Sequence, residues 1–143
     1  MQDVIQREIT VKATKESVYA AITDPTQIIS WFPDAVEGSF EVGAQPVLSF
    51  DGYGKSRIYI ADAKPFKYFA YRWIPGDSEV VDDVTCVPNT LVEFMIEEMG
   101  EETKVTLKES GFAALPADVA EEKLKMNVGG WEYMMDRLEK IFA

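Results

Sequence analysis

The sequence predicts an α+β fold in which an antiparallel sheet packs against one long helix at the C-terminal end. Two observations lead to this prediction. Through the middle of the chain, short segments of alternating apolar and polar residues are joined by tight turns, a pattern typical of antiparallel strands. From Ala117 onward, apolar residues instead recur every three or four positions, which is typical of an amphipathic helix. The length of 143 residues suits a single domain spanning residues 1–143.

The first elements are expected to be a strand and two short helices. Residues 4–12 alternate in polarity, so we expect a strand with one buried face. Thr14 suits the N-cap of the first helix, because its hydroxyl can accept a hydrogen bond from a free backbone N–H. Asp24 suits the N-cap of the second helix, with Pro25 at the first helical position, and Pro33 ends that helix.

The middle of the chain is expected to form the rest of the sheet. We predict strands over residues 36–42, 46–51, 57–63, 67–74, 91–98 and 103–109. Turn residues separate these segments, and strands joined by tight turns are antiparallel. The acidic, irregular residues 75–88 are predicted to form a mobile loop. The first strand pairs either at an edge of this sheet or between two later strands.

The long helix contains two adjacent glycines, Gly129 and Gly130. Each glycine inside a helix costs about 1 kcal/mol relative to alanine, so some compensation is expected. We expect a continuous helix in which the pair allows a close approach to the sheet or leaves cavity space beside Trp131. The alternative is a break, with one helix ending near Val128 and another beginning at Trp131.

Composition excludes several classes of function. With 14 Lys and Arg against 25 Asp and Glu, the net charge of −11 disfavours nucleic acids and anionic membranes as partners. The chain has no histidine, which excludes histidine-based nucleophile activation, and its single cysteine, Cys86, excludes a structural zinc site. We therefore expect no metal and no cofactor, and we assign no catalytic residue. The N-terminal residues do not resemble a signal peptide and no apolar run could span a membrane, so a cytoplasmic location is expected.

Several segments together resemble a known family. They are residues 17–25 with Trp31-Phe32, residues 62–73, residues 103–112 and Gly130-Trp131. In this order they resemble the standalone relatives of the C-terminal domain of the activator of the heat-shock-protein-90 ATPase. That family lies in the START-like, pollen-allergen-like (SRPBCC) superfamily of helix-grip folds, and the resemblance runs nearly end to end.

The resemblance implies a helix-grip fold. In this fold a curved antiparallel sheet wraps around a long C-terminal helix, two short helices follow the first strand, and an elongated apolar cavity lies between sheet and helix. Members of the superfamily use the cavity for lipids, sterols, polyketides and other apolar molecules. Family members often carry a histidine before Ser-Gly-Phe, and this chain carries Glu109 there, so no role of that histidine is transferred to it.

Aromatic residues and methionines at inward positions are the candidates for lining such a cavity. The predicted lining comprises Trp31, Phe32, Phe69, Tyr71, Trp73, Phe94, Val105, Leu107, Gly130, Trp131, Met134, Met135 and Leu138. The alternative is that these side chains fill a solid core. Arg7 and Tyr59 are candidate polar anchors for a ligand, the alternative for Arg7 being an arginine that reaches solvent or a structural carboxylate.

The leading hypothesis is a non-enzymatic domain that binds a small apolar or amphipathic molecule between the sheet and the long helix. The second hypothesis is an enzyme of cyclase or dehydratase type acting on an apolar substrate in the same cavity. The third is a module that interacts with a chaperone, and it is the least favoured. The sequence leaves the oligomeric state open, a homodimer included, and it predicts neither nucleic-acid binding nor membrane insertion.

Overall fold

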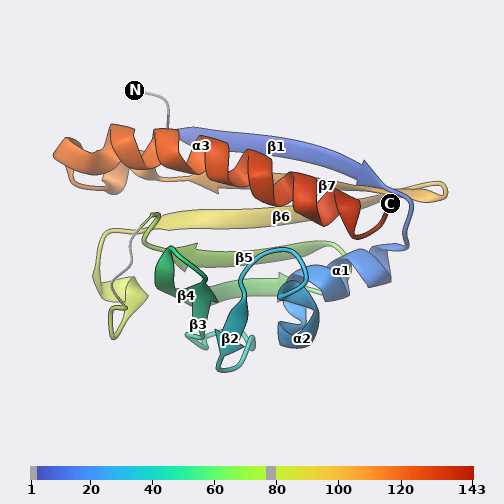
Figure 1. The fold of residues 1–143 in the computed structure, drawn as a ribbon, viewed down its shortest axis with the longest axis horizontal. Helices are drawn as coiled ribbons and strands as arrows, with labels where there is room; N and C mark the ends of the chain where they lie inside the picture. Colours follow the sequence, from blue (N-terminus) through green and yellow to red (C-terminus); the bar gives the residue numbers. More distant parts are fainter. Residues whose placement is uncertain (1–2, 77–79) are drawn as a thin grey trace.

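The described residues form one curved, seven-stranded antiparallel sheet, against which the helices pack (Figure 1). The computed structural model describes residues 3–76 and 80–143. Its strands are β1 (Val4–Val11), β2 (Ala35–Glu37), β3 (Val47–Phe50), β4 (Gly54–Lys64), β5 (Tyr68–Trp73), β6 (Thr90–Met99) and β7 (Glu102–Ser110). They lie in the order β1-β7-β6-β5-β4-β3-β2, and every neighbouring pair is antiparallel. The first strand therefore pairs with the last one, at an edge of the sheet.

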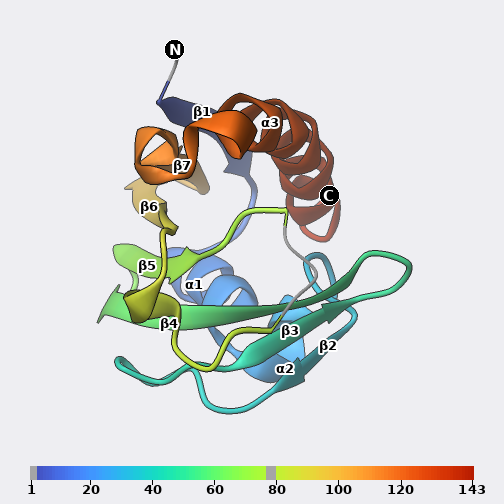
Figure 2. The same ribbon diagram turned by 90° about the vertical axis from the view of Figure 1, so that its left-hand side faces the viewer.

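The α-helices lie on the inner side of the curved sheet (Figure 2). These α-helices are α1 (Lys15–Thr23), α2 (Pro25–Ile28) and the long α3 (Ala117–Lys140). Two short 3-10 helices, η1 (Val84–Cys86) before β6 and η2 (Phe112–Ala114) before α3, belong to the connecting segments. In Figure 2 the sheet bends from β1 and β7 through β5 to β2, and α3 lies across its upper part. This arrangement confirms the predicted α+β helix-grip fold.

The two short helices begin as the sequence predicts. The backbone N–H of Ser17 donates to Thr14 Oγ1 at 3.1 Å, and the N–H of Thr26 donates to Asp24 Oδ1 at 2.8 Å. Each side chain thereby satisfies one of the N–H groups that the first turn of a helix leaves free. The indole N–H of Trp31 donates to the carbonyl of Ala21 at 2.8 Å, which ties the segment after α2 back to α1.

The long helix is continuous through the glycine pair, as predicted. Of the two explanations expected for the pair, close approach to the sheet is wrong, and open space is what the structure has. A Cβ atom built on either Gly129 or Gly130 would meet no atom within 4 Å outside its own helix backbone and chain neighbours, so the glycines leave open space. On the buried side of the helix, Trp131 is 2 % exposed and Leu138 is fully buried.

The sheet departs from the prediction in the segment 36–42, where only Ala35–Glu37 forms a strand. Gly38 ends it with a φ of +113°, and a Cβ atom there would lie 3.1 Å from the Cα of Pro46. Beyond this point the backbone bonds to β4 instead, with the N–H of Gly43 donating to the carbonyl of Ile60 at 2.8 Å. The alternating residues predict a longer strand, but the positive φ of Gly38 turns the backbone away from the extended conformation and ends the strand.

The predicted mobile loop 75–88 is partly described, since residues 77–79 lie outside the described residues. The described part is anchored by side chains. Arg57 donates to the carbonyls of Val81 and Gln45, both at 2.7 Å, and the Nε2 of Gln45 donates to Asp83 at 2.9 Å.

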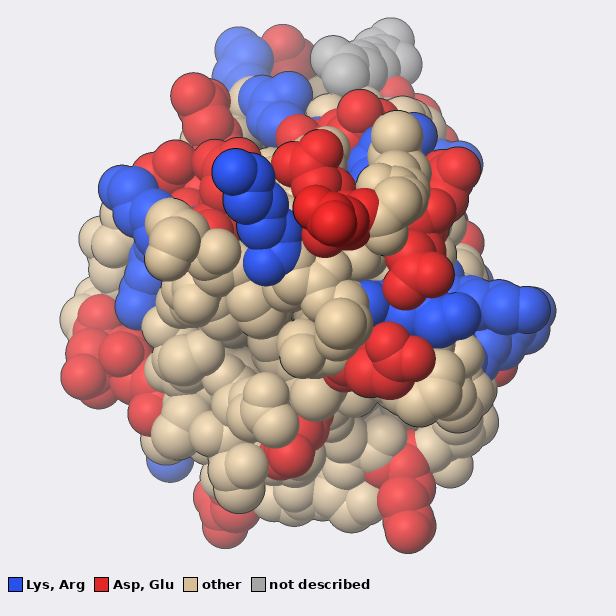
Figure 3. Space-filling view, turned by 90° about the vertical axis from the view of Figure 1, so that its right-hand side faces the viewer, with Lys and Arg blue, Asp and Glu red and all other residues tan. Residues whose placement is uncertain are grey.

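The surface carries charges of both signs. At the end of the molecule that bears the C-terminus, acidic side chains are scattered among single basic ones around an uncharged area (Figure 3). Among the described helices, none combines the length and apolar character needed to cross a bilayer.

Candidate functional site

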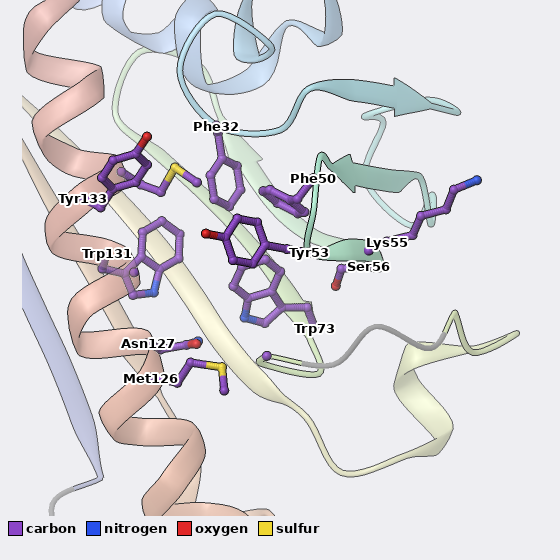
Figure 4. Close-up of a pocket in the computed structure, with 14 residues that line it drawn as sticks. Phe32, Phe50, Tyr53, Lys55, Ser56, Trp73, Met126, Asn127, Trp131 and Tyr133 are labelled. Carbon is purple, nitrogen blue, oxygen red and sulfur yellow. The ribbon is translucent and has the colours of Figure 1, made fainter.

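A pocket of about 470 Å³ lies between α3 and the hairpin formed by β3 and β4 (Figure 4). Six aromatic residues and two methionines contribute to its wall. The lining comprises Phe32, Phe50, Tyr53, Gly54, Lys55, Ser56, Trp73, Gly76, Met126, Asn127, Gly130, Trp131, Tyr133 and Met134. Pockets of this volume with mostly apolar and aromatic walls are typical of small-molecule sites.

The inner wall is made by three large rings that pack on one another. The ring centroids of Phe32 and Trp131 are 5.3 Å apart in a stacked arrangement, and those of Trp73 and Trp131 are 5.9 Å apart. Phe32 and Trp73 are also 5.9 Å apart. All three side chains are buried, so they form a rigid apolar surface at the back of the pocket.

The outer rim is exposed. Tyr53, in the turn between β3 and β4, is 86 % exposed, and Tyr133 on α3 is 61 % exposed. They stand on opposite sides of the pocket in Figure 4, with Met126 on the same helix as Tyr133. Lys55 also belongs to the lining, but its ammonium group points away from the pocket (Figure 4).

A buried carboxylate lies directly behind the inner wall. Glu109 on β7 has no exposed surface, and it was not among the residues that the sequence singled out for the site. Its Oε1 accepts hydrogen bonds from Asn127 Nδ2 at 2.8 Å and from Trp131 Nε1 at 2.7 Å. Its Oε2 accepts from Trp73 Nε1 at 2.8 Å and from Thr90 Oγ1 at 2.6 Å.

Glu109 thus fixes the orientation of the pocket wall. Both indole N–H groups point back toward the carboxylate, so the two tryptophans turn other parts of their rings to the pocket. The same four hydrogen bonds join β7 to β5, β6 and α3. One residue therefore couples the position of the long helix to the shape of the pocket.

Tyr71 lies in the core next to this group. Its side chain is buried, and its hydroxyl oxygen has no hydrogen-bond partner within the described part of the chain. Burial raises the pKa of Tyr71 well above its usual value, and the negative charge of Glu109 raises it further. Both effects keep the hydroxyl group of Tyr71 protonated at neutral pH.

The structure divides the predicted lining into two groups. Phe32, Trp73, Gly130, Trp131 and Met134 line the pocket. The others are not part of this wall. They are Trp31, Phe69, Tyr71, Phe94, Val105, Leu107, Met135 and Leu138, all buried in the hydrophobic core.

Arg7 and Tyr59 are not brought to the pocket. Arg7 on β1 lines a separate groove with Glu132, Asp136 and Glu139 of α3, and within the described residues its guanidinium donates a long, 3.4 Å bond to the carbonyl of Gln6. Tyr59 is half-buried between the fully buried Ile58 and Ile60 of β4, so it faces the opposite side of the sheet. Their role as anchors would need a different site.

Sequence reasoning missed the residues from the hairpin and part of those from the helix. Phe50, Tyr53 and Ser56 reach the pocket because the β3–β4 hairpin folds toward α3, which no local pattern reveals. Asn127 and Glu109 could have been noticed, since Asn127 interrupts the apolar stripe and Glu109 has the same strand parity as Val105 and Leu107. A polar residue at an inward position is the signal in both cases.

The arrangement can enclose an apolar body and offer few polar contacts. The indole N–H groups are already engaged by Glu109, which leaves Ser56, Asn127 and the two rim tyrosines as polar groups on the wall. In the described ranges 3–76 and 80–143, no group of three or more Cys, Asp and Glu side chains is placed to hold a metal ion.

Comparison with known families gives a clear match. The model of the family described as "Activator of Hsp90 ATPase homolog 1-like protein" matches residues 12–143. The chain belongs to this family. A search of curated protein sequences gave no significant match.

Solved structures of similar fold place this AHSA1-like chain among helix-grip proteins. DynU16, described as a protein in the dynemicin biosynthetic locus, aligns with a TM-score of 0.76 and 20% identity over 98% of this chain. The alignment covers 47% of DynU16, so the chain spans about half the length of that protein. The Aha1 dimer from Colwellia psychrerythraea aligns with a TM-score of 0.68 and 21% identity, covering 96% of this chain and 97% of Aha1. An AHSA1-like protein from Rhizobium etli aligns with a TM-score of 0.68 and 27% identity, covering 98% of this chain and 81% of that protein.

Proposed function

We propose that this AHSA1-like chain binds a small apolar or amphipathic molecule in the pocket between α3 and the β3–β4 hairpin. The observation that carries the proposal is the lining, in which six aromatic residues and two methionines surround about 470 Å³. Aromatic rings provide large apolar contact areas, and methionine side chains adapt their shape to irregular ligands. A volume in this range is typical of pockets that hold a single small molecule.

Open space on α3 supports binding over a solidly filled core. Gly130 lines the pocket, and a side chain there would meet no atom within 4 Å at its Cβ. The helix accepts a glycine at a cost of about 1 kcal/mol at a position where a larger residue would enter the pocket. Keeping the pocket open accounts for that cost.

The relatives support a small-molecule role only by association. DynU16 is described as a protein in the dynemicin biosynthetic locus, and that association belongs to DynU16. Extending a small-molecule role to this chain is part of the proposal. A homodimer and a cytoplasmic location stay predictions, with the solution dimer of the Colwellia Aha1 as a precedent for the former.

The proposal is limited to binding. A cyclase or dehydratase would need ionisable groups that converge inside the pocket. The ionisable residues of its described lining are Tyr53, Tyr133 and Lys55, and they do not converge: the two tyrosines stand on opposite sides and the ammonium group of Lys55 points away (Figure 4). No observation on the described residues favours the chaperone module over a small-molecule site.

A displacement assay tests the proposal. We expect the neutral dye N-phenyl-1-naphthylamine to gain fluorescence on binding and to be displaced by small apolar molecules, with one-to-one complexes in native mass spectra. Gly130→Leu should abolish the signal, because the new side chain enters the pocket. Gly129→Leu is the matched control, since Gly129 lines the separate groove beside Arg7. An unchanged dye spectrum with the wild-type chain would refute the proposal.

A further inference from the structure

The carboxylate of Glu109 has no cationic partner among the residues that the structure describes. The ion pairs of the described chain involve Lys64, Lys104, Lys125 and Lys140, and all of them lie at the surface. The partners of Glu109 are two indoles, an amide and a hydroxyl, all of them neutral. A buried charge is normally paired, so this one is unusual.

The carboxylate of Glu109 accepts all four of its hydrogen bonds. Indole nitrogens can only donate, and one of them faces each carboxylate oxygen. Four donors spread the negative charge over their own dipoles but do not cancel it. Its electrostatic effect therefore extends through the wall of the pocket, as it does toward Tyr71.

The two indoles carry this effect to the pocket surface. An indole that donates its N–H to an anion becomes more electron-rich on its ring, because hydrogen-bonded groups polarise one another. Tryptophan already has the ring that attracts cations most strongly, and Trp73 and Trp131 both line the pocket. Phe32, Phe50, Tyr53 and Tyr133 add further aromatic surface around them.

Among the described residues, two lysines come near the pocket: Lys123 on α3 is not part of the lining, but its ammonium group lies at the rim, where it donates to the carbonyl of the lining residue Gly76 at 3.0 Å. Lys55 is the basic residue of the described lining, and its ammonium group points away (Figure 4). The net charge of −11 adds a long-range attraction for cations and a repulsion for anions. An anionic amphiphile would meet Glu109 behind the wall, and the ammonium group of Lys123 at the rim would compensate it only in part.

We infer that the pocket selects organic cations, namely molecules with an apolar body that bears one ammonium or quaternary ammonium group. The inference rests on the proposed function and names the chemical class of the ligand. The aromatic rings contact the cation and the apolar body together, and the carboxylate behind the wall supplies the opposite charge. Desolvation of an alkylated ammonium is cheaper than that of a primary one, so alkylation should favour binding.

Three ligands of the same size but different charge test the inference. They are benzyltrimethylammonium, its neutral isostere neopentylbenzene, and the anion 3-phenylpropionate, each measured by displacement of N-phenyl-1-naphthylamine. We expect the cation to bind roughly tenfold more tightly than the isostere, and the anion to bind most weakly. Equal affinities for cation and isostere would overturn the inference and leave the proposed function standing. Failure of the dye and all three ligands to bind would overturn both.

Two variants test whether the aromatic rim and Glu109 cause the preference for the cation. Tyr53→Leu removes an exposed rim ring and should leave folding intact, lowering affinity for the cation several-fold while the isostere changes little. Glu109→Gln should bring the ratio of the two affinities close to one, provided that its circular dichroism matches that of the wild type and that it still unfolds cooperatively, at whatever lower stability. Should Glu109→Gln fail to fold, the ratios for wild type and Tyr53→Leu decide the matter. A ratio that Tyr53→Leu leaves unchanged would contradict a role for the aromatic rim.

Discussion

At the scale of single residues, Glu109 connects stability to the pocket. A carboxylate without exposed surface is costly, and the cost is offset here by four donors from β5, β6 and α3. Two of those donors are the tryptophans of the inner wall. A substitution at Glu109 should therefore affect the stability of the fold and the position of the two wall tryptophans together.

We expect Glu109→Gln to lower the free energy of unfolding by about 2–4 kcal/mol. The amide keeps the size of the side chain, but its NH₂ group must face two donors instead of accepting from them. Urea denaturation measures the loss. Glu93→Gln is the control, because the half-buried Glu93 accepts only from the hydroxyl of Tyr68, and about 1 kcal/mol or less should be lost. Equal losses in the two variants would contradict the special position of Glu109.

The sequence predicted single residues least well. Its alternation placed Val105 and Leu107 on an inward face, and Glu109 follows at the next inward position. A carboxylate is tolerated at this buried position because donors from three other elements hydrogen-bond to it. These donors come together only in the folded chain, so the sequence pattern does not reveal them. In the same way, Tyr53 reaches the pocket because of the direction of a hairpin, not because of its local pattern.

At the scale of elements, the sequence was more informative. The stripe of the long helix, the two caps at Thr14 and Asp24, and the hairpin of β6 and β7 are local patterns, and the structure confirms them. The shortened β2 was not predicted, and the sequence could not decide between close approach and open space at the glycine pair, because both depend on what lies opposite in three dimensions.

The segment around η1 depends on one carboxylate. Asp83 accepts hydrogen bonds from the backbone N–H and hydroxyl of Thr85 and from Gln45 Nε2, at 2.9, 2.7 and 2.9 Å. The Thr85 hydroxyl, then the Gln45 amide and the Thr85 N–H, lower the pKa of Asp83 to about 2. The folded pKa lies below the unfolded one of about 3.9, so the stabilisation is complete above that value.

We therefore expect this contribution to be lost as the pH falls from about 4 to about 2. Asp83→Asn should show a smaller stability than the wild type at pH 6, and the difference should shrink as the pH approaches 2. Urea denaturation across this pH range measures it. Asp82→Asn serves as the control, since the neighbouring exposed carboxylate lacks the partners of Asp83. A wild-type-to-variant difference that stays constant from pH 6 to pH 2 would refute the assignment.

At the scale of the whole molecule, the excess of negative charge opposes folding. A net charge of −11 on a chain of this size repels itself in the folded state, and salt screens that repulsion. The groove between β1 and α3 gathers several acidic groups, with Glu8, Glu132, Asp136 and Glu139 around Arg7. The exposed ion pairs of the chain, such as Lys125 with Glu121 at 3.4 Å, contribute little in comparison.

We expect Glu132→Lys to raise Tm at low salt by about 1–3 °C. The change removes one negative charge from the groove and adds one positive charge, and the new ammonium group lies one helical turn from Asp136. Lys125→Glu is the opposite control: it adds two units of negative charge and breaks the pair with Glu121, so Tm should fall. Scanning calorimetry at low and high salt measures both variants.

Because the effect is long-range repulsion, the two Tm values should converge at about 1 M salt, where charges are screened within about 3 Å. A gap that persists at high salt would show that local packing, and not the charge of the whole molecule, separates the variants.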